Sequence, residues 1–250
     1  RLQAAAVAFG EQVPIPEIVA IGGQSDGKSS LLEALLGEEE DTAYGPPLAP
    51  SAVCEAILRR TEAHLAALEA AVSPKPVVLR VEYAHCATLT LIDTPGFVMR
   101  ARQGESAGTP EEIAAMVREQ CAPKHRLILF LQQSSVEWAS SLWMHVVQEL
   151  DPHFERTIVV SSKFDNRLKE FSHRAEVDQY LAAAGYLPAN VRPFFVALPK
   201  DRGASPSCAD WRRAIQEVDA RVFETLTQRI EGGYDAERFA SRVGFASLKR

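Results

Sequence analysis

Gly22-Gly23-Gln24-Ser25-Asp26-Gly27-Lys28-Ser29-Ser30 is the stretch of this 250-residue chain that decides its fold. The apolar run Ile18-Val19-Ala20-Ile21 before it is short enough to be a buried strand. The run from Leu31 to Leu36 after it consists of good helix formers and stops at Gly37. A glycine-rich loop between a strand and a helix, with Lys-Ser at its end, is typical of a phosphate-binding loop. The sequence therefore predicts a site for a phosphorylated ligand.

The backbone of this loop explains its chemistry. Glycines let successive N–H groups turn toward one point, and the positive end of the helix dipole adds to their attraction for phosphate oxygens. We expect Lys28 to reach the β- and γ-phosphates and the Ser29 hydroxyl to ligate Mg²⁺. The other expected nucleotide contacts in the loop are Gly22, Gly23, Ser25, Asp26, Gly27 and Ser30. An ordinary glycine turn capping a helix is the alternative.

Composition excludes several other classes of protein. Hydrophobic residues make up 46% and charged residues 24%, which suits a globular domain with a real core, and the net charge of −6 argues against a nucleic-acid partner. The four cysteines have no disulfide or C-x-x-C spacing, so we expect reduced thiols in the cytosol. The six histidines show no zinc-ligand spacing, and no apolar run approaches the ~20 residues of a membrane span. Because the chain opens with Arg1, we expect it to be part of a longer protein.

Apolar periodicity along the chain predicts an α/β fold over residues 1–250, a single domain with a doubly wound, mostly parallel sheet and helices on both faces. Strands are expected at 18–21, 77–83, 88–92, 126–131, 157–161 and 193–197, with 77–83 and 88–92 forming a hairpin that adds one antiparallel strand. Helices are expected at 2–9, 31–36, 51–71, 109–121, 140–150 and 207–231, with one more ending at Ala184. A capping box, Thr109-Pro110-Glu111-Glu112, is expected to start the helix at 109. The amphipathic end, 234–250, either packs back on the domain or leads into another part.

A second motif, Asp93-Thr94-Pro95-Gly96, ends one of these strands. Ligands of doubly wound sheets bind at the carboxyl ends of strands, so this segment should face the phosphate loop. We expect Asp93 to hold Mg²⁺ through water and the Gly96 amide to sense the γ-phosphate, which makes the following loop a switch. A simple turn closing the hairpin is the alternative.

A third motif, Ser162-Lys163-Phe164-Asp165, has the N/T-K-x-D arrangement that reads guanine. One carboxylate on Asp165 can accept both the N1–H and the 2-amino group of guanine, whereas adenine would leave it desolvated and unpaired. The aliphatic stem of Lys163 can cover the base. Ser162 replaces the usual Asn or Thr and is expected to brace the phosphate loop less well. Leu198, Pro199 and Lys200 stand where a last loop lines the base; a solvated strand-end charge pair is the alternative for the motif.

The three motifs, in this order, resemble a GTPase of the dynamin superfamily. The resemblance spans nearly the whole chain and includes the phosphate loop, Glu149-Leu150-Asp151-Pro152 and the closing segment from Tyr234 to Leu248. Asp26 stands where the family carries a small residue. Together with the segments 132–138 and 162–167, it resembles the plant and algal branch that constricts dividing chloroplasts.

This resemblance implies a self-assembling mechanoenzyme whose GTPase domains bind GTP and GDP, form a homodimer across the nucleotide and hydrolyse GTP. It further implies that Gln24 helps to position the attacking water and that Ser25 ligates a monovalent cation, K⁺ or Na⁺. The sequence agrees, because Phe97 follows Gly96 where Ras-like enzymes carry a water-orienting glutamine. The protein is then expected in the cytoplasm, recruited to an organelle membrane, the chloroplast outer envelope in this branch. Membrane contact would be made only through regions outside this chain, the stalk and membrane-binding parts. The Asp26 carboxylate is expected beside the phosphates, with some repulsion unless a cation or Lys28 offsets it.

Two features depart from the family pattern. The acidic positions that act in trans across the dimer fall near Ser141 and Leu168, so we expect different dimer contacts. The first switch, a catalytic Thr followed by an Arg-rich strand, is not found, because only thirteen residues separate Gly37 from Ser51. We therefore expect a segment to be missing near residues 37–38.

Two other functions remain open from the residues alone. The first is a nucleotide-dependent assembly switch with little hydrolysis, favoured by the missing first switch and by Ser141. The second is a P-loop ATPase or small-molecule kinase, which requires Asp165 to be incidental. Trp138 and Trp143 are expected to be core or loop anchors rather than interface residues.

Overall fold

The structure, a computed structural model, describes residues 16–36, 89–200 and 208–249, together with positions 59, 61–63, 65–66 and 72–74. The predicted helices at 2–9 and 51–71, the strand at 77–83 with its hairpin, and the join at 37–38 lie wholly or mainly outside these residues. The antiparallel strand of the predicted sheet is one of the segments outside the described residues, so it remains a prediction.

A five-stranded sheet in the order β2-β1-β3-β4-β5 forms the centre of the described part, and all of its pairings are parallel. The strands are β1 (Glu17–Gly22), β2 (Thr90–Asp93), β3 (Arg126–Gln133), β4 (Thr157–Ser162) and β5 (Phe194–Phe195). Each corresponds to a strand expected from the sequence, although β5 is only two residues long. Because the strands run in one direction, their carboxyl ends meet at a single edge of the sheet.

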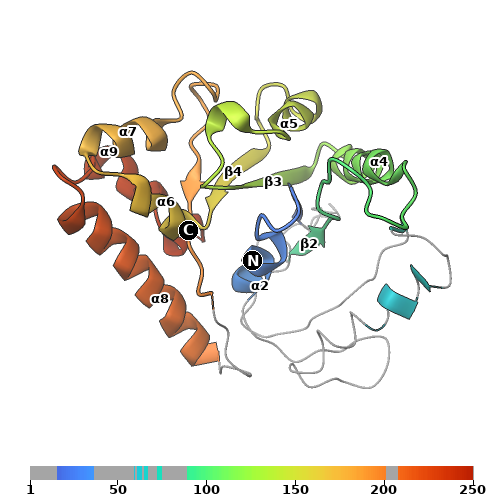
Figure 1. The fold of residues 1–250 in the computed structure, drawn as a ribbon, viewed down its shortest axis with the longest axis horizontal. Coiled ribbons are helices and arrows are strands. Elements are labelled where there is room, and N and C mark those ends of the chain that lie inside the picture. The colour runs from blue at the N-terminus through green and yellow to red at the C-terminus, as the bar shows by residue number, and fades with distance from the viewer. Residues whose placement is uncertain are drawn as a thin grey trace, which may run out of the picture.

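Helices connect the strands and cover both faces of the sheet (Figure 1). The α-helices are α2 (Lys28–Leu36), α4 (Thr109–Cys121), α5 (Met144–Leu150), α6 (Phe164–Arg167), α7 (Arg174–Ala182), α8 (Cys208–Glu224), α9 (Ala236–Phe239) and α10 (Phe245–Leu248). Shorter turns are η1 (Trp138–Ser140), η2 (Leu168–Glu170), η4 (Ala240–Arg242) and the π-helical η3 (Thr225–Arg229), which follows α8 directly.

Two hydrophobic clusters lie on the two faces of the sheet, because successive strand residues point in opposite directions. Val19 and Ile21 of β1 belong to a large cluster that contains buried residues of α4, α5 and α7. Ala20 between them belongs to a smaller cluster with Leu31 of α2 and Phe245 of α10. Figure 1 shows α4 and α5 on one side of the sheet and α2 on the other. The alternation confirms the doubly wound α/β fold.

The start of α4 differs from its prediction. The helix covers the expected residues, but Gly108 is its N-cap and no side chain makes a capping hydrogen bond. Thr109 is already the first helical residue, and its buried hydroxyl has no hydrogen-bond partner. The expected capping box is therefore wrong, because a threonine that is itself the first helical residue does not stand in the N-cap position, from which a side-chain oxygen accepts the free N–H groups of the first turn.

The end of the described chain packs back on the domain, which decides between the two expectations for 234–250. Tyr234, Phe239, Val243 and Phe245 are all buried. The N–H of Gly244 donates to the carbonyl of Phe195 at 2.9 Å, so this segment is hydrogen-bonded to β5 as well as packed against it.

Candidate nucleotide site

The phosphate loop leaves β1 at the carboxyl edge of the sheet and enters α2 at Lys28. The Lys28 side chain is almost fully buried, and its Nζ donates to the carbonyls of Gly22 at 3.2 Å and Gly23 at 3.1 Å. Burial lowers the pKa of Lys28, while the charges of Asp93 and Asp26 partly oppose this effect. A desolvated ammonium held inside a loop of backbone amides is well suited to bind phosphate oxygens.

The second motif meets the phosphate loop as the sequence predicts. The Ser29 hydroxyl donates to Asp93 Oδ2 at 2.6 Å, which joins the first turn of α2 to the end of β2. Thr94 Oγ1 donates to the carbonyl of Ala20 at 2.7 Å and ties the motif to β1. A hydroxyl and a carboxylate are hard oxygen ligands of the kind that Mg²⁺ takes together with substrate phosphates, so the pair fits this ion.

Backbone hydrogen bonds join the two motifs. Phe97 N–H donates to the carbonyl of Gly22 at 3.0 Å, and Gln24 N–H donates to the carbonyl of Phe97 at 3.2 Å. A Cβ on Gly96 would lie 2.8 Å from Gln24 Cα, so only glycine allows this approach. The Phe97 ring is buried and stacks on Trp143 with centroids 4.7 Å apart. Phe97 therefore anchors the segment after Gly96, and Trp143 is the loop anchor that the sequence predicts.

The third motif braces the phosphate loop directly. Ser162 Oγ donates to the carbonyl of Asp26 at 2.7 Å. The short side chain of Ser162 therefore reaches the phosphate loop, and the expectation that it braces the loop less well than Asn or Thr stays a prediction. Lys163 follows in the left-handed conformation with φ 53°, and Asp165 lies in the first turn of α6. Lys200 Nζ lies 3.1 Å from Asp165 Oδ2, so the last loop is paired with the carboxylate that the sequence assigns to guanine.

A cavity of about 360 Å³ brings these segments together. It is lined by eight of the residues expected from the sequence: Gly27, Ser30, Ser162, Lys163, Asp165, Leu198, Pro199 and Lys200. It is also lined by five residues that sequence reasoning missed: Leu31, Val160, Asn166, Val196 and Trp211. Four of them are apolar and carry no motif, so no local signal could have found them, whereas Asn166 directly follows the third motif.

The remaining predicted residues lie beside the cavity rather than in its wall. Gln24 and Ser25 are exposed at the tip of the phosphate loop, and Gly96 approaches Lys28, since a Cβ there would lie 3.2 Å from Lys28 Nζ. The Asp26 carboxylate turns back into the loop, where its Oδ2 accepts the Gly23 N–H at 2.6 Å. Asp26 thus finds a partner that the sequence did not indicate.

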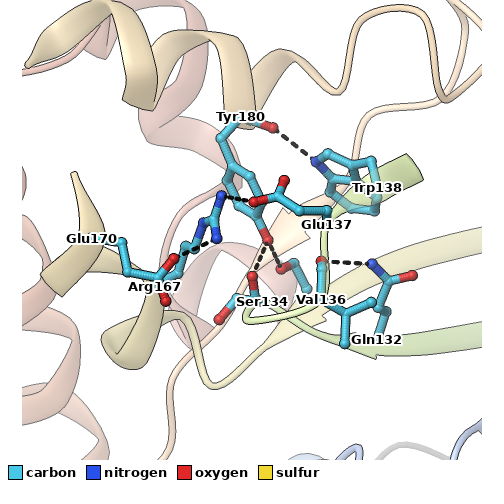
Figure 2. Close-up of polar contacts among 9 residues, drawn as sticks. Gln132, Ser134, Val136, Glu137, Trp138, Arg167, Glu170 and Tyr180 are labelled. Carbon is cyan, nitrogen blue, oxygen red and sulfur yellow. Dashed lines mark hydrogen bonds and ion pairs between the residues drawn. The ribbon is translucent and has the colours of Figure 1, made fainter. Parts of the chain in front are cut away.

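A second group of missed residues supports the base-recognition segment (Figure 2). Tyr180 of α7 shares a hydrogen bond of 2.9 Å with Ser161 Oγ and donates to the carbonyl of Ser134 at 3.0 Å. Arg167, next to this ring, forms ion pairs with Glu137 and Glu170. Figure 2 shows how these contacts connect the loop after β3 with α6 and α7.

The expected core position of Trp138 is confirmed within the same group. Its indole N–H donates to the carbonyl of Tyr180 at 3.0 Å, and its side chain is almost fully buried. Burial raises the pKa of Tyr180 to about 12, so its hydroxyl stays protonated and can donate at neutral pH. Together these contacts hold the loop after β3 against α7.

Among the residues that the structure describes, there is no group of three or more His, Cys, Asp or Glu that could hold a metal ion. Mg²⁺ with one carboxylate, one hydroxyl and substrate phosphates needs no such group. In the same part of the chain, no helix combines the length and the apolar character needed to span a membrane.

The geometry defines a P-loop nucleotide-binding domain, with a phosphate loop, a carboxylate beside it and a cavity of about 360 Å³ at one edge of a parallel sheet. The family model of the dynamin family matches residues 49–164. Dynamin-related protein 5A of Arabidopsis thaliana is 54% identical over 284 residues that cover 100% of this chain and 35% of the relative. The chain belongs to the dynamin family and is a GTPase domain of that family.

More distant relatives agree with this assignment. Dynamin-like protein C of Dictyostelium discoideum is 36% identical over 86% of this chain and 22% of its own length. Dynamin-like protein ARC5 of Arabidopsis thaliana is 27% identical over 94% of this chain and 36% of its own length. The chain therefore spans about a third or less of the length of each of these three relatives.

Proposed function

We propose that this domain binds GTP in the cavity between the phosphate loop and Asp165 and hydrolyses it with Mg²⁺. The observation that carries the proposal is the shared cavity, which is lined by Gly27 and Ser30 on the phosphate side and by Lys163 and Asp165 on the base side. Asp165 accepts the two guanine donors, and Lys28 with the loop amides binds the phosphates. Leu198, Pro199 and Trp211 supply apolar surface for the base.

Ser29 and Asp93 are the residues that would hold Mg²⁺, which neutralises charge on the phosphate oxygens when it is bound. Gln24 orients the attacking water, because Phe97 has no polar atom in its side chain and is buried against Trp143. Ser25 contributes to a site for K⁺ or Na⁺. Both side chains are exposed at the tip of the loop, which supports a role that is completed when a second GTPase domain covers the nucleotide.

Dimer formation across the nucleotide is part of the proposal. The family's trans-acting acidic positions fall near Ser141 and Leu168, and Leu168 is buried in the core here. A buried leucine cannot contact a partner's nucleotide, so other residues must make the equivalent contacts. In the whole protein, assembly of this kind would constrict an organelle membrane through regions outside this chain, and the chloroplast outer envelope is the proposed location.

The first switch, which is not found in this sequence, is the main departure from the family pattern. The comparison with Dynamin-related protein 5A extends over 284 residues, whereas this chain has 250, so the relative has residues without a counterpart here. This difference supports our inference that a segment is missing, and its place near residues 37–38 is inferred from the sequence. Peptide mapping of the protein isolated from its natural source tests the inference: a peptide that runs from residue 37 into residue 38 without an insertion contradicts it.

GTP turnover measured against protein concentration, in KCl and in choline chloride of equal ionic strength, tests the proposed function. The rate per molecule should rise with concentration and should be higher in KCl. Flat rates near zero with tight GTP binding would favour an assembly switch, to which the missing first switch already points. Tighter binding of ATP than of GTP would contradict both the GTPase and the assembly switch and would favour an ATPase or a small-molecule kinase.

A further inference from the structure

Asp26 is a carboxylate inside a loop that binds phosphate, and two negative groups at one place would repel each other. The position of the Asp26 side chain shows how the loop accommodates it. Oδ2 accepts the Gly23 N–H at 2.6 Å; burial raises the pKa of the same carboxylate, and the neighbouring Gln133 side chain helps to lower it. A Cβ on Gly23 would lie 2.9 Å from Asp26 Oδ2, closer than real Cβ contacts come, so the glycine is needed for this bond. The carboxylate therefore closes the loop on itself.

Gln133 makes a second contact with the loop. Its Nε2 donates to the carbonyl of Ser25 at 3.1 Å. Ser25 has φ 67°, a left-handed conformation that costs a non-glycine residue of order 1–3 kcal/mol unless its surroundings hold it. Asp26 and Gln133 act on either side of this strained residue, because Asp26 accepts the N–H of Gly23, two residues before it, and Gln133 donates to its own carbonyl.

We call the contact of Asp26 with Gly23 and the contact of Gln133 with Ser25 the brace. The register of the sheet explains why this brace is rigid. Gln133 of β3 and Ser162 of β4 are paired residues at the carboxyl ends of neighbouring strands. Gln133 holds the carbonyl of Ser25, and Ser162 holds the carbonyl of Asp26 at 2.7 Å. Two adjacent strand ends thus hold two consecutive carbonyls of the phosphate loop.

We propose that Asp26 and Gln133 are positioning residues that hold Gln24 and Ser25 in the conformation needed for GTP hydrolysis. The inference rests on the proposed function, because it assigns these two residues to the same reaction. Lys28 and the amides at the start of α2 bind the phosphates without help from Asp26, so the brace acts on turnover more than on ground-state affinity. A misplacement of about 1 Å at such a group can lower a rate by about 100-fold.

The test compares Asp26→Ala with Asp26→Asn and adds Gln133→Met, which keeps the length of the side chain but cannot donate to Ser25. Asp26→Ala and Gln133→Met should lower kcat by about tenfold or more, with KM and the Kd for GDP changed less than about threefold. Asp26→Asn should keep most of the activity, because its amide oxygen can still accept the Gly23 N–H. Asp151→Asn is the matched control, since Asp151 also accepts backbone N–H groups but lies far from the phosphate loop in sequence and contact.

Wild-type kcat in Asp26→Ala and Gln133→Met would overturn the proposal. So would an equal loss of kcat in Asp26→Asn and Asp26→Ala, because charge rather than the hydrogen bond would then matter. Amide hydrogen exchange of a peptide that contains Gly23 reads the brace without turnover, and it should be faster in Asp26→Ala than in the wild type. If the wild type shows no turnover, the proposed function fails, while the exchange result still decides whether the brace exists.

Discussion

The Ser29 hydroxyl donates a hydrogen bond of 2.6 Å to Asp93 Oδ2, although the two residues are 64 positions apart in the chain. Both oxygens are also the expected ligands of Mg²⁺, directly or through water. Ser29→Ala and Asp93→Asn should each weaken Mg²⁺-dependent binding of a fluorescent GTP analogue by about tenfold or more, because one oxygen ligand is worth more than about 1.4 kcal/mol at such a site.

The measurement is a titration with and without EDTA. The weakening should disappear in EDTA, where the wild type has also lost the ion. Ser106→Ala, which removes an exposed hydroxyl in the loop before α4, is the control and should bind like the wild type. An equal loss of affinity with and without Mg²⁺ would contradict the assignment.

Asp165 should decide which base is bound. Asp165→Asn offers one acceptor and one donor in place of two acceptors, which suits the N1–H and 2-oxo groups of xanthine. The variant should lose GTP affinity by at least about 100-fold and prefer XTP, since the guanine 2-amino group would then face another donor, an unpaired buried donor costs about 1–3 kcal/mol, and the remaining contact to N1–H loses its charge. Competition between GTP and XTP for a fluorescent nucleotide measures this. Unchanged preference for GTP would show that Asp165 does not contact the base.

Trp143 should report on the segment that follows Gly96. Its ring stacks on Phe97, whose backbone is hydrogen-bonded to Gly22 and Gln24. In a Trp211→Phe background, which removes the indole that lines the cavity, GTP binding should still change tryptophan fluorescence, and Trp143→Phe should abolish that change. Persistence of the full change in Trp143→Phe would mean that the loop after Gly96 does not respond to the nucleotide.

Asp151 should stabilise the fold at neutral pH. Burial by itself would raise the pKa of Asp151, but hydrogen bonds from the Thr157 hydroxyl and from the N–H groups of Arg156 and Glu155 outweigh burial and lower it. A lowered pKa means that this stability is present above 3.8, the value for a free aspartate, and is lost as the pH falls through the folded-state pKa. Asp151→Asn should lower the free energy of unfolding by about 1–3 kcal/mol at pH 7.

Urea unfolding at several pH values checks this prediction. The difference between the wild type and Asp151→Asn should shrink in acid, where the wild-type carboxylate becomes protonated. A difference that stays constant with pH would assign the effect to packing instead of charge.

Asp26 should destabilise the fold at neutral pH, which is the opposite of the effect expected for Asp151. Burial raises the pKa of Asp26, and this effect outweighs the Gly23 and Gln133 hydrogen bonds and the charges of Lys28 and Lys163. A raised pKa means that the ionised carboxylate costs stability above the folded-state pKa and costs nothing once it is protonated in both states. Asp26→Asn should therefore have a higher Tm than the wild type at pH 7, and the gap should close in acid. A lower Tm for the variant at pH 7 would contradict the direction of this shift.

The sequence by itself determined the order of the elements and the identity of the three motifs. Ile18 to Ile21, Gly27, Lys28 and the run after Ser30 indicate a buried strand, a phosphate loop and a helix, because each is specified by near neighbours in the chain. The direction of the strands then follows from the alternation of strands and helices, which brings Asp93 and Asp165 to the same edge.

Only the tertiary structure decided how these segments touch. The reach of Ser162 to the carbonyl of Asp26, the turn of the Asp26 carboxylate toward Gly23 and the position of Trp211 in the cavity wall depend on distances between elements far apart in the chain. The start of α4 is a further example, because the sequence alone did not show that Thr109 lies inside the helix and makes no cap. Local patterns determine which residues form an element, whereas packing of elements to within about an ångström determines which polar atoms meet, and no single stretch of sequence contains that information.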